Sequence, residues 1–194
     1  MKLPSQLEAL NKIIRILENN SIEYMLIGGW ALPAYGHIRA TIDIDLAIAI
    51  KQPEKLDQLI SDLRSKQYQI MFNPKIDHPV FPILDEENKV EMELWQKPDG
   101  IDMGAEILKR RRKIRKDNLS FWIISPEDFI INKLSIPNRS PADEEDVITV
   151  LHRQRDRLDR RYLENRAKQA GLLSLLEALQ DRLTEISHSY DEYD

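Results

Sequence analysis

The chain of 194 residues contains no cysteine and no apolar run long enough to cross a membrane. The first absence excludes a disulfide framework and a cysteine-based zinc site. The second excludes a transmembrane helix, which needs about 20 consecutive apolar residues. The opening residues, MKLPSQLEALNKII, also lack the continuous apolar block of a signal peptide. We therefore expect a cytoplasmic protein with no membrane partner.

The sequence also has no large excess of charge of one sign. Its formal net charge is −5, from 28 Lys and Arg against 33 Asp and Glu. This balance argues against a general nucleic-acid coat, which would be strongly basic, and favours an ordinary soluble protein. The local exception is KRRRKIRK at 109–116. We interpret it as the solvated end of a helix, with contact to RNA backbone or another polyanion as the alternative.

Apolar periodicity predicts a mixed sheet flanked by helices, followed by a helical C-terminal part. The predicted strands span residues 23–27, 42–50, 67–72, 79–84, 89–95 and 120–124, and the predicted helices span 5–19, 30–35, 53–66 and 103–113. The stretch Ser125-Pro126-Glu127-Asp128 has the cap, proline and acids of a helix N-terminus. We predict a catalytic domain over 1–136 and a helical region over 137–194 that packs on it.

Two carboxylates lie one residue apart in the strand IDIDLAIAI at 42–50. Alternation directs Asp43 and Asp45 to one face, and Ile42, Ile44 and Leu46 to the other. Two carboxylates about 7 Å apart on one face repel each other unless a proton or a cation intervenes. Hard oxygen ligands suit Mg²⁺, which commonly takes one or two carboxylates together with substrate phosphates.

A glycine pair, Gly28-Gly29, interrupts the chain where the strand at 23–27 ends and the helix at 30–35 is expected. Glycine lets another group approach the backbone closely, and a helix N-terminus presents free N–H groups to anions. The glycine pair and the acidic pair together predict a phosphate cradle beside a metal clamp.

The pattern apolar-Gly-Gly, short helix, apolar-Asp-apolar-Asp-apolar resembles the nucleotidyltransferase superfamily with the DNA polymerase β-type fold. The residues that carry it are Ile27-Gly28-Gly29 and Ile42-Asp43-Ile44-Asp45-Leu46. The sequence GGWAL…R-x-T-x-DIDL is similar to small aminoglycoside and lincosamide nucleotidyltransferases, and to those of toxin–antitoxin and abortive-infection systems. The resemblance covers about residues 22–95, with a weaker extension to about 150 through SPEDFIINKL. It implies an α/β (α+β) fold.

The resemblance implies Mg²⁺-dependent transfer of a nucleoside monophosphate, most readily AMP from ATP. The acceptor would be a hydroxyl group of a small molecule, a protein or a tRNA end. Asp43 and Asp45 would hold one or two ions. A third carboxylate is expected in KVEMELW, where Glu91 and Glu93 share a face. The family order favours Glu91 as the metal ligand, and Glu93 stays an alternative.

Further residues match the family at the nucleotide. Gly28 and Gly29 would cradle the phosphates, Trp30 would form part of the pocket wall, and Arg39 and Thr41 match an R-x-T pattern. Lys133 matches a lysine that approaches the nucleotide. The alternative function is a catalytically weak, nucleotide-binding antitoxin or partner-regulatory module of a toxin–antitoxin system.

Overall fold

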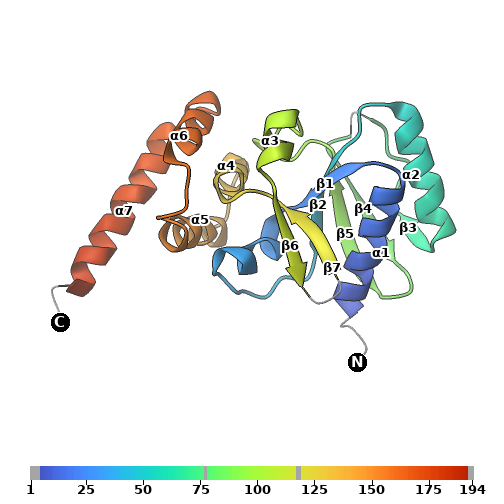
Figure 1. The fold of residues 1–194 in the computed structure, drawn as a ribbon, viewed down its shortest axis with the longest axis horizontal. Helices are drawn as coiled ribbons and strands as arrows, with labels where there is room; N and C mark the ends of the chain where they lie inside the picture. Colours follow the sequence, from blue (N-terminus) through green and yellow to red (C-terminus); the bar gives the residue numbers. More distant parts are fainter. Residues whose placement is uncertain (1–4, 77, 117–118, 192–194) are drawn as a thin grey trace. The chain divides into compact units, whose positions relative to one another are not determined.

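The computed structural model describes residues 5–76, 78–116 and 119–191 (Figure 1). The chain divides into two compact units. The first unit comprises the chain up to Ala31, Arg39–Pro98 and Asp102–Ile124, and the second comprises Leu32–Ile38, Asp99–Ile101 and the chain from Ser125 onward. The main boundary between the two units lies before Ser125, whereas the predicted boundary lies after residue 136. The placement of catalysis in 1–136 stays a prediction.

The first unit is built on one seven-stranded sheet with the order β3-β4-β5-β2-β1-β7-β6. Its strands are β1 (Glu23–Leu26), β2 (Ile44–Ala49), β3 (Tyr68–Ile70), β4 (Val80–Asp85), β5 (Val90–Trp95), β6 (Arg112–Lys116) and β7 (Leu119–Ile123). The pairs β2–β5 and β1–β7 are parallel, and the remaining pairs are antiparallel. The predicted mixed sheet is therefore confirmed.

Three helices belong to this unit: α1 (Ser5–Asn19), α2 (Pro53–Ser65) and α3 (Ala105–Arg110). The first two pack against each other and are seen side by side in Figure 1. Their buried residues recur at intervals of three and four, as in Leu10, Ile13 and Leu17 of α1. Burial of each such side chain stabilises the fold by about 2 kcal/mol, so this apolar stripe fixes the helices on the sheet.

The predicted helix over 30–35 is wrong, because two short 3₁₀ turns replace it: η1 (Gly28–Trp30) and η2 (Leu32–Tyr35). Gly28 has a φ of 61°, which a continuing right-handed helix does not allow. Gly36 has a φ of 87°, so the right-handed segment also ends directly after Tyr35. The predicted strand also starts late, at Ile44, and Ile42 is 78% exposed instead of buried.

The basic run is the second correction. Helix α3 ends at Arg110, and the next residues form β6, which pairs antiparallel with β7. Lysine and arginine favour helices, so local propensity points the wrong way here. Arg111 fixes the start of the strand, because its guanidinium donates to the Tyr24 carbonyl at 2.9 Å and forms an ion pair with Glu23. Sheet pairing therefore overrides the intrinsic preference.

The second unit is helical, with α4 (Pro126–Ser135), α5 (Pro141–Arg153), α6 (Arg160–Gln169) and α7 (Leu173–Asp191). Its four helices pack as α4–α5, α4–α6, α5–α7 and α6–α7. Ser125 caps α4 as predicted, since its hydroxyl accepts the Asp128 N–H. In the ranges that the structure describes, no helix combines the length and the apolar character needed to span a membrane.

Buried polar bonds tie α4 to α6 inside this unit. The Asp128 carboxylate accepts the Ser125 hydroxyl at 2.8 Å, the Tyr162 hydroxyl at 2.9 Å and the Arg166 Nε–H at 3.3 Å. Burial raises the pKa of Asp128, although these three donors oppose that effect. A buried carboxylate with so many partners indicates a structural role.

Candidate functional site

Parallel pairing of β2 with β5 places two of the predicted acids side by side. The register aligns Asp45 with Glu93, and neighbouring strands lie about 4.8 Å apart. The residues on either side, Ile44 and Leu46, are fully buried on the opposite face. Alternation therefore uses the apolar residues to hold the strand in the core and leaves both carboxylates on the other face.

The electrostatics connect a third acid to this pair. Burial raises the pKa of Glu93, and the negative charges of Asp45 and then Asp43 raise it further. Asp43 lies just before β2 and is exposed. Glu91 is exposed as well, and it lies opposite Leu84 of β4. Of the two alternatives for the third carboxylate, Glu93 is the one that the fold places beside Asp45.

The glycine pair wraps around these residues at very short range. A Cβ atom on Gly28 would lie 2.2 Å from Oδ2 of Asp45, and one on Gly29 would lie 2.7 Å from Oγ1 of Thr41. Real contacts do not reach such distances, so both positions need glycine for close approach. The Ile27 N–H also donates to the Asp45 carbonyl at 3.0 Å, which fixes the turn against β2. The sequence predicted that another group approaches the glycine backbone closely, but not that this group is the Asp45 side chain.

Three further predicted residues lie in the same unit. Trp30 is half-buried in η1, and its indole N–H is buried with no hydrogen-bond acceptor in the described part of the chain. Arg39 is exposed, and its guanidinium donates to the Ala40 carbonyl at 3.4 Å. The Thr41 hydroxyl lies 3.5 Å from the Asp43 carbonyl. Their contacts with a nucleotide stay predictions.

Lys133 lies in α4 of the second unit and is buried there. Its ammonium contacts Asp143 at 2.6 Å and Asp146 at 3.1 Å, both in α5. His37 adds a further contact to Asp146 at 3.5 Å. The Lys133 charge is thus neutralised within its own unit, and its predicted role at the nucleotide is not tested by these contacts.

The donor set suits a magnesium ion that arrives with its substrate. Within residues 5–76, 78–116 and 119–191, no three His, Asp or Glu side chains form a ready metal site. Asp45 and Glu93 nevertheless offer hard oxygen donors whose mutual repulsion a dication would relieve. Magnesium usually binds one or two carboxylates and completes its shell with phosphates and water. The residues present fit that mode.

A family model of nucleotidyl transferases of unknown function (DUF2204) matches residues 6–180. The chain belongs to this family. The predicted membership of the nucleotidyltransferase superfamily is confirmed, and nucleotidyl transfer is the activity that the family describes. No curated protein matches the chain.

Solved structures of nucleotidyltransferases share the fold. The lincosamide antibiotic adenylyltransferase LnuA, bound to lincomycin, is 16% identical with a TM-score of 0.51, over 74% of this chain and 94% of that one. ANT(2″)-Ia in complex with adenylyl-2″-tobramycin is 15% identical with a TM-score of 0.51, over 92% and 98%. An antigenic nucleotidyltransferase-like protein from Paracoccidioides brasiliensis is 18% identical with a TM-score of 0.53, over 92% of each chain.

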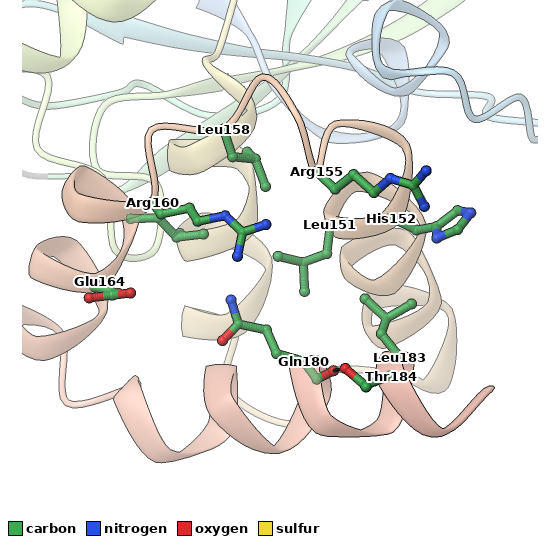
Figure 2. Close-up of a pocket in the computed structure, with 10 residues that line it drawn as sticks. Leu151, His152, Arg155, Leu158, Arg160, Glu164, Gln180, Leu183 and Thr184 are labelled. Carbon is green, nitrogen blue, oxygen red and sulfur yellow. Dashed lines mark hydrogen bonds between the residues drawn. The ribbon is translucent and has the colours of Figure 1, made fainter. Parts of the chain in front are cut away.

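The second unit holds a pocket of about 370 Å³ that the sequence did not predict. Helices α5, α6 and α7 line it, with the connection before α6 (Figure 2). Figure 2 shows Arg160 and Gln180 directed into the space around Leu151. Apolar and polar side chains contribute to its wall, so it has no single chemical character.

Proposed function

We propose that the chain transfers AMP from ATP to a hydroxyl acceptor in a magnesium-dependent reaction. The observation that carries this proposal is the alignment of Asp45 with Glu93, with the Gly28 backbone against Asp45. A structural sheet would not gain from like charges on adjacent central strands, because they repel each other. A site for a metal-bound triphosphate explains them.

Asp43 and Asp45 are the metal-holding residues in this proposal. A magnesium ion bound there supplies positive charge next to the triphosphate. The backbone of Gly28 and Gly29 takes the phosphates, because only glycine leaves room beside Asp45 and Thr41. The unpaired Trp30 indole N–H and the Arg39 guanidinium are donors for the nucleotide.

Glu93 acts as the general base. Its carboxylate lies beside Asp45 in the register of β2 and β5, which places a proton acceptor next to the proposed metal. It takes the proton of the acceptor hydroxyl, and the oxygen forms a bond to the α-phosphorus. The bond from that phosphorus to the bridging oxygen breaks, and pyrophosphate leaves. Glu91 is exposed and would act from the rim of the site.

The acceptor class is a hydroxyl compound. The fold neighbours named above include proteins solved with lincomycin and with adenylylated tobramycin. Below 25% identity this likeness extends to the fold alone, so antibiotics belong in a panel of acceptors beside RNA and protein. The hard oxygen donors of the carboxylate face support magnesium and a metal-bound triphosphate, and ATP is the triphosphate that the family resemblance favours.

The experiment measures pyrophosphate release from ATP and Mg²⁺ in the presence of such a panel, with α-labelled ATP to identify the modified acceptor. Asp57→Asn is a matched control, because Asp57 is an exposed carboxylate on α2. Release that is lost in Asp45→Asn and retained in Asp57→Asn supports the proposal. Equal release from both variants would mean that the acidic pair is not the catalytic site.

A further inference from the structure

The strand β6 is a dense row of positive charge in a chain whose net charge is negative. Seven of the eight residues over 109–116 are lysine or arginine, in a protein of formal charge −5. Transferase chemistry at Asp45 does not use them. Strand β6 also ends the strand order, next to β7, so its outer edge has no strand partner in the described sheet (Figure 1).

The register places part of this row on the carboxylate face. Asp45 and Ala47 share a face of β2, and Ala47 pairs with Met25 of β1. The pairing of Leu26 with Ile123 sets Met25 level with Trp122, and Trp122 pairs with Lys113. Residues at paired positions point to the same face. Lys113 therefore projects from the same face of the sheet as Asp45.

Alternation extends that face along β6. Arg115 follows Lys113 by two residues, about 7 Å further along the strand. Three strand spacings separate β6 from β2, which is about 14 Å across the sheet. Along the strands the register sets Arg115 level with Ala49, four residues from Asp45, so the cations and the carboxylates share one face of the sheet but lie well apart on it. We define Lys113 and Arg115 as the β6 cation pair.

The β6 cation pair is available to an external partner. Both side chains are exposed, and in the described ranges no carboxylate lies within ion-pair distance of either. Their neighbour Arg111 differs, because it pairs with Glu23 and lies 4.3 Å over the Trp122 ring. The Lys113 ammonium lies 5.2 Å from the same ring. The Trp122 ring is therefore occupied by cations rather than open for base stacking.

We propose that the β6 cation pair binds the phosphodiester backbone of a single-stranded nucleic acid. Two cations about 7 Å apart along a strand complement the regularly spaced charges of a polyanion. Because Trp122 is already covered by cations, the contact is to phosphate and carries no base preference. The proposal concerns binding, and the further idea that the bound strand is the hydroxyl acceptor rests on the proposed function.

Phosphate contacts release counterions, so the interaction has a defined salt dependence. For single strands the slope of log K against log salt is about −0.7 for each phosphate neutralised. Neutralising two cations should thus make the slope less steep by about 1.4 and weaken binding roughly tenfold at low salt.

The test uses fluorescence anisotropy of labelled RNA and DNA strands of equal sequence, about 16 nucleotides long, from about 50 to 200 mM salt. The variant is Lys113→Gln with Arg115→Gln. The matched control is Lys51→Gln with Lys66→Gln, two exposed lysines elsewhere in the same unit. Circular dichroism checks that both double variants are folded.

The expected result is weaker binding and a reduced salt slope in the β6 variant, with the control unchanged. If the protein binds RNA but not DNA, the 2′-hydroxyl is contacted as well as the phosphate. If it binds RNA and DNA equally, the contact is to phosphate alone. The proposal is overturned by no binding, by equal binding of variant and wild type, or by equally effective displacement with polyglutamate. The last result would indicate an acidic protein partner.

A final arm separates this proposal from the transferase proposal. The Asp45→Asn protein should bind the RNA strand with wild-type affinity, since Asp45 lies three strands away from β6. If the wild-type protein binds RNA but transfers nothing from ATP to any acceptor, only the proposed function is overturned. Transfer that survives the β6 substitutions on a small acceptor, with RNA binding lost, would support both.

Discussion

The sequence assigned Asp43, Asp45 and Lys133 to one nucleotide site, but the structure places them in two separate charge clusters. The two clusters differ in the signs of the charges that they bring together. On β2 and β5, Asp43, Asp45 and Glu93 bring like charges together, and the pKa of Glu93 rises through burial and then through its neighbours. In the second unit, buried Lys133 lies between Asp143 and Asp146. The contacts described for the first cluster join like charges, whereas those of the second include an ammonium between two carboxylates. A cluster of like charges is typical of a site for a charged ligand, and a buried ion-pair cluster is typical of architecture.

The largest effect is expected at the like-charge cluster of β2 and β5. Asp45→Asn should reduce transfer from ATP by about a thousandfold, because the ion proposed to neutralise the developing phosphate charge would lose a carboxylate ligand. Removal of a repulsive charge should at the same time leave the free energy of unfolding unchanged or raise it. Steady-state kinetics and urea unfolding on the same protein measure both quantities. Loss of stability together with activity would contradict this contrast.

The buried ion-pair cluster should respond in the reverse way. Lys133→Met removes the ammonium that lies between two carboxylates of α5. Breaking a buried pair from one side costs about 3 kcal/mol, so a marked fall in the urea midpoint is expected. The double variant with Asp143→Asn should recover part of the loss. A catalytic defect without loss of stability would instead favour the predicted contact of Lys133 with the nucleotide.

A glycine tests whether close packing maintains the carboxylate face. Gly28→Ala places a Cβ 2.2 Å from Oδ2 of Asp45, and the backbone there has a φ of 61°. The strain and the displacement together should lower the free energy of unfolding by about 2 kcal/mol and reduce transfer. Gly171→Ala is the control, because φ is 69° there but nothing lies within 4 Å of the added atom. The difference between the two variants measures the crowding at Asp45.

The sequence predicted the parts of the fold that depend on periodicity. The alternation from Ile44 onward and the cap at Ser125 were predicted correctly, because each rests on local chemistry. The alternation fails at Ile42, which lies before β2 and is exposed. The β6 strand was missed because arginine and lysine favour helices, and only the pairing with β7 makes the segment extended. Glu93 could not be separated from Glu91, since period-two alternation gives both the same face. The register against β2, which is a long-range property, makes the distinction.

The smallest effect concerns a compensated carboxylate within the first unit. Burial alone would raise the pKa of Asp85, but bonds from Asn88, Lys12 and the Glu87 N–H outweigh it and hold the pKa below its usual value. A group with a lowered folded pKa stabilises the protein above its unfolded pKa, about 3.9, and this contribution is lost as the pH falls through the lower, folded value. Asp85→Asn should therefore be less stable than wild type by about 1 kcal/mol at neutral pH, and the gap should close in acid. Urea unfolding at a series of pH values measures it, with the exposed Asp57→Asn as control. Lys12 pairs with Asp85 as Lys133 pairs with Asp146. If the difference in unfolding free energy between Asp85→Asn and wild type did not change with pH, packing and not charge would explain how such paired carboxylates stabilise the fold.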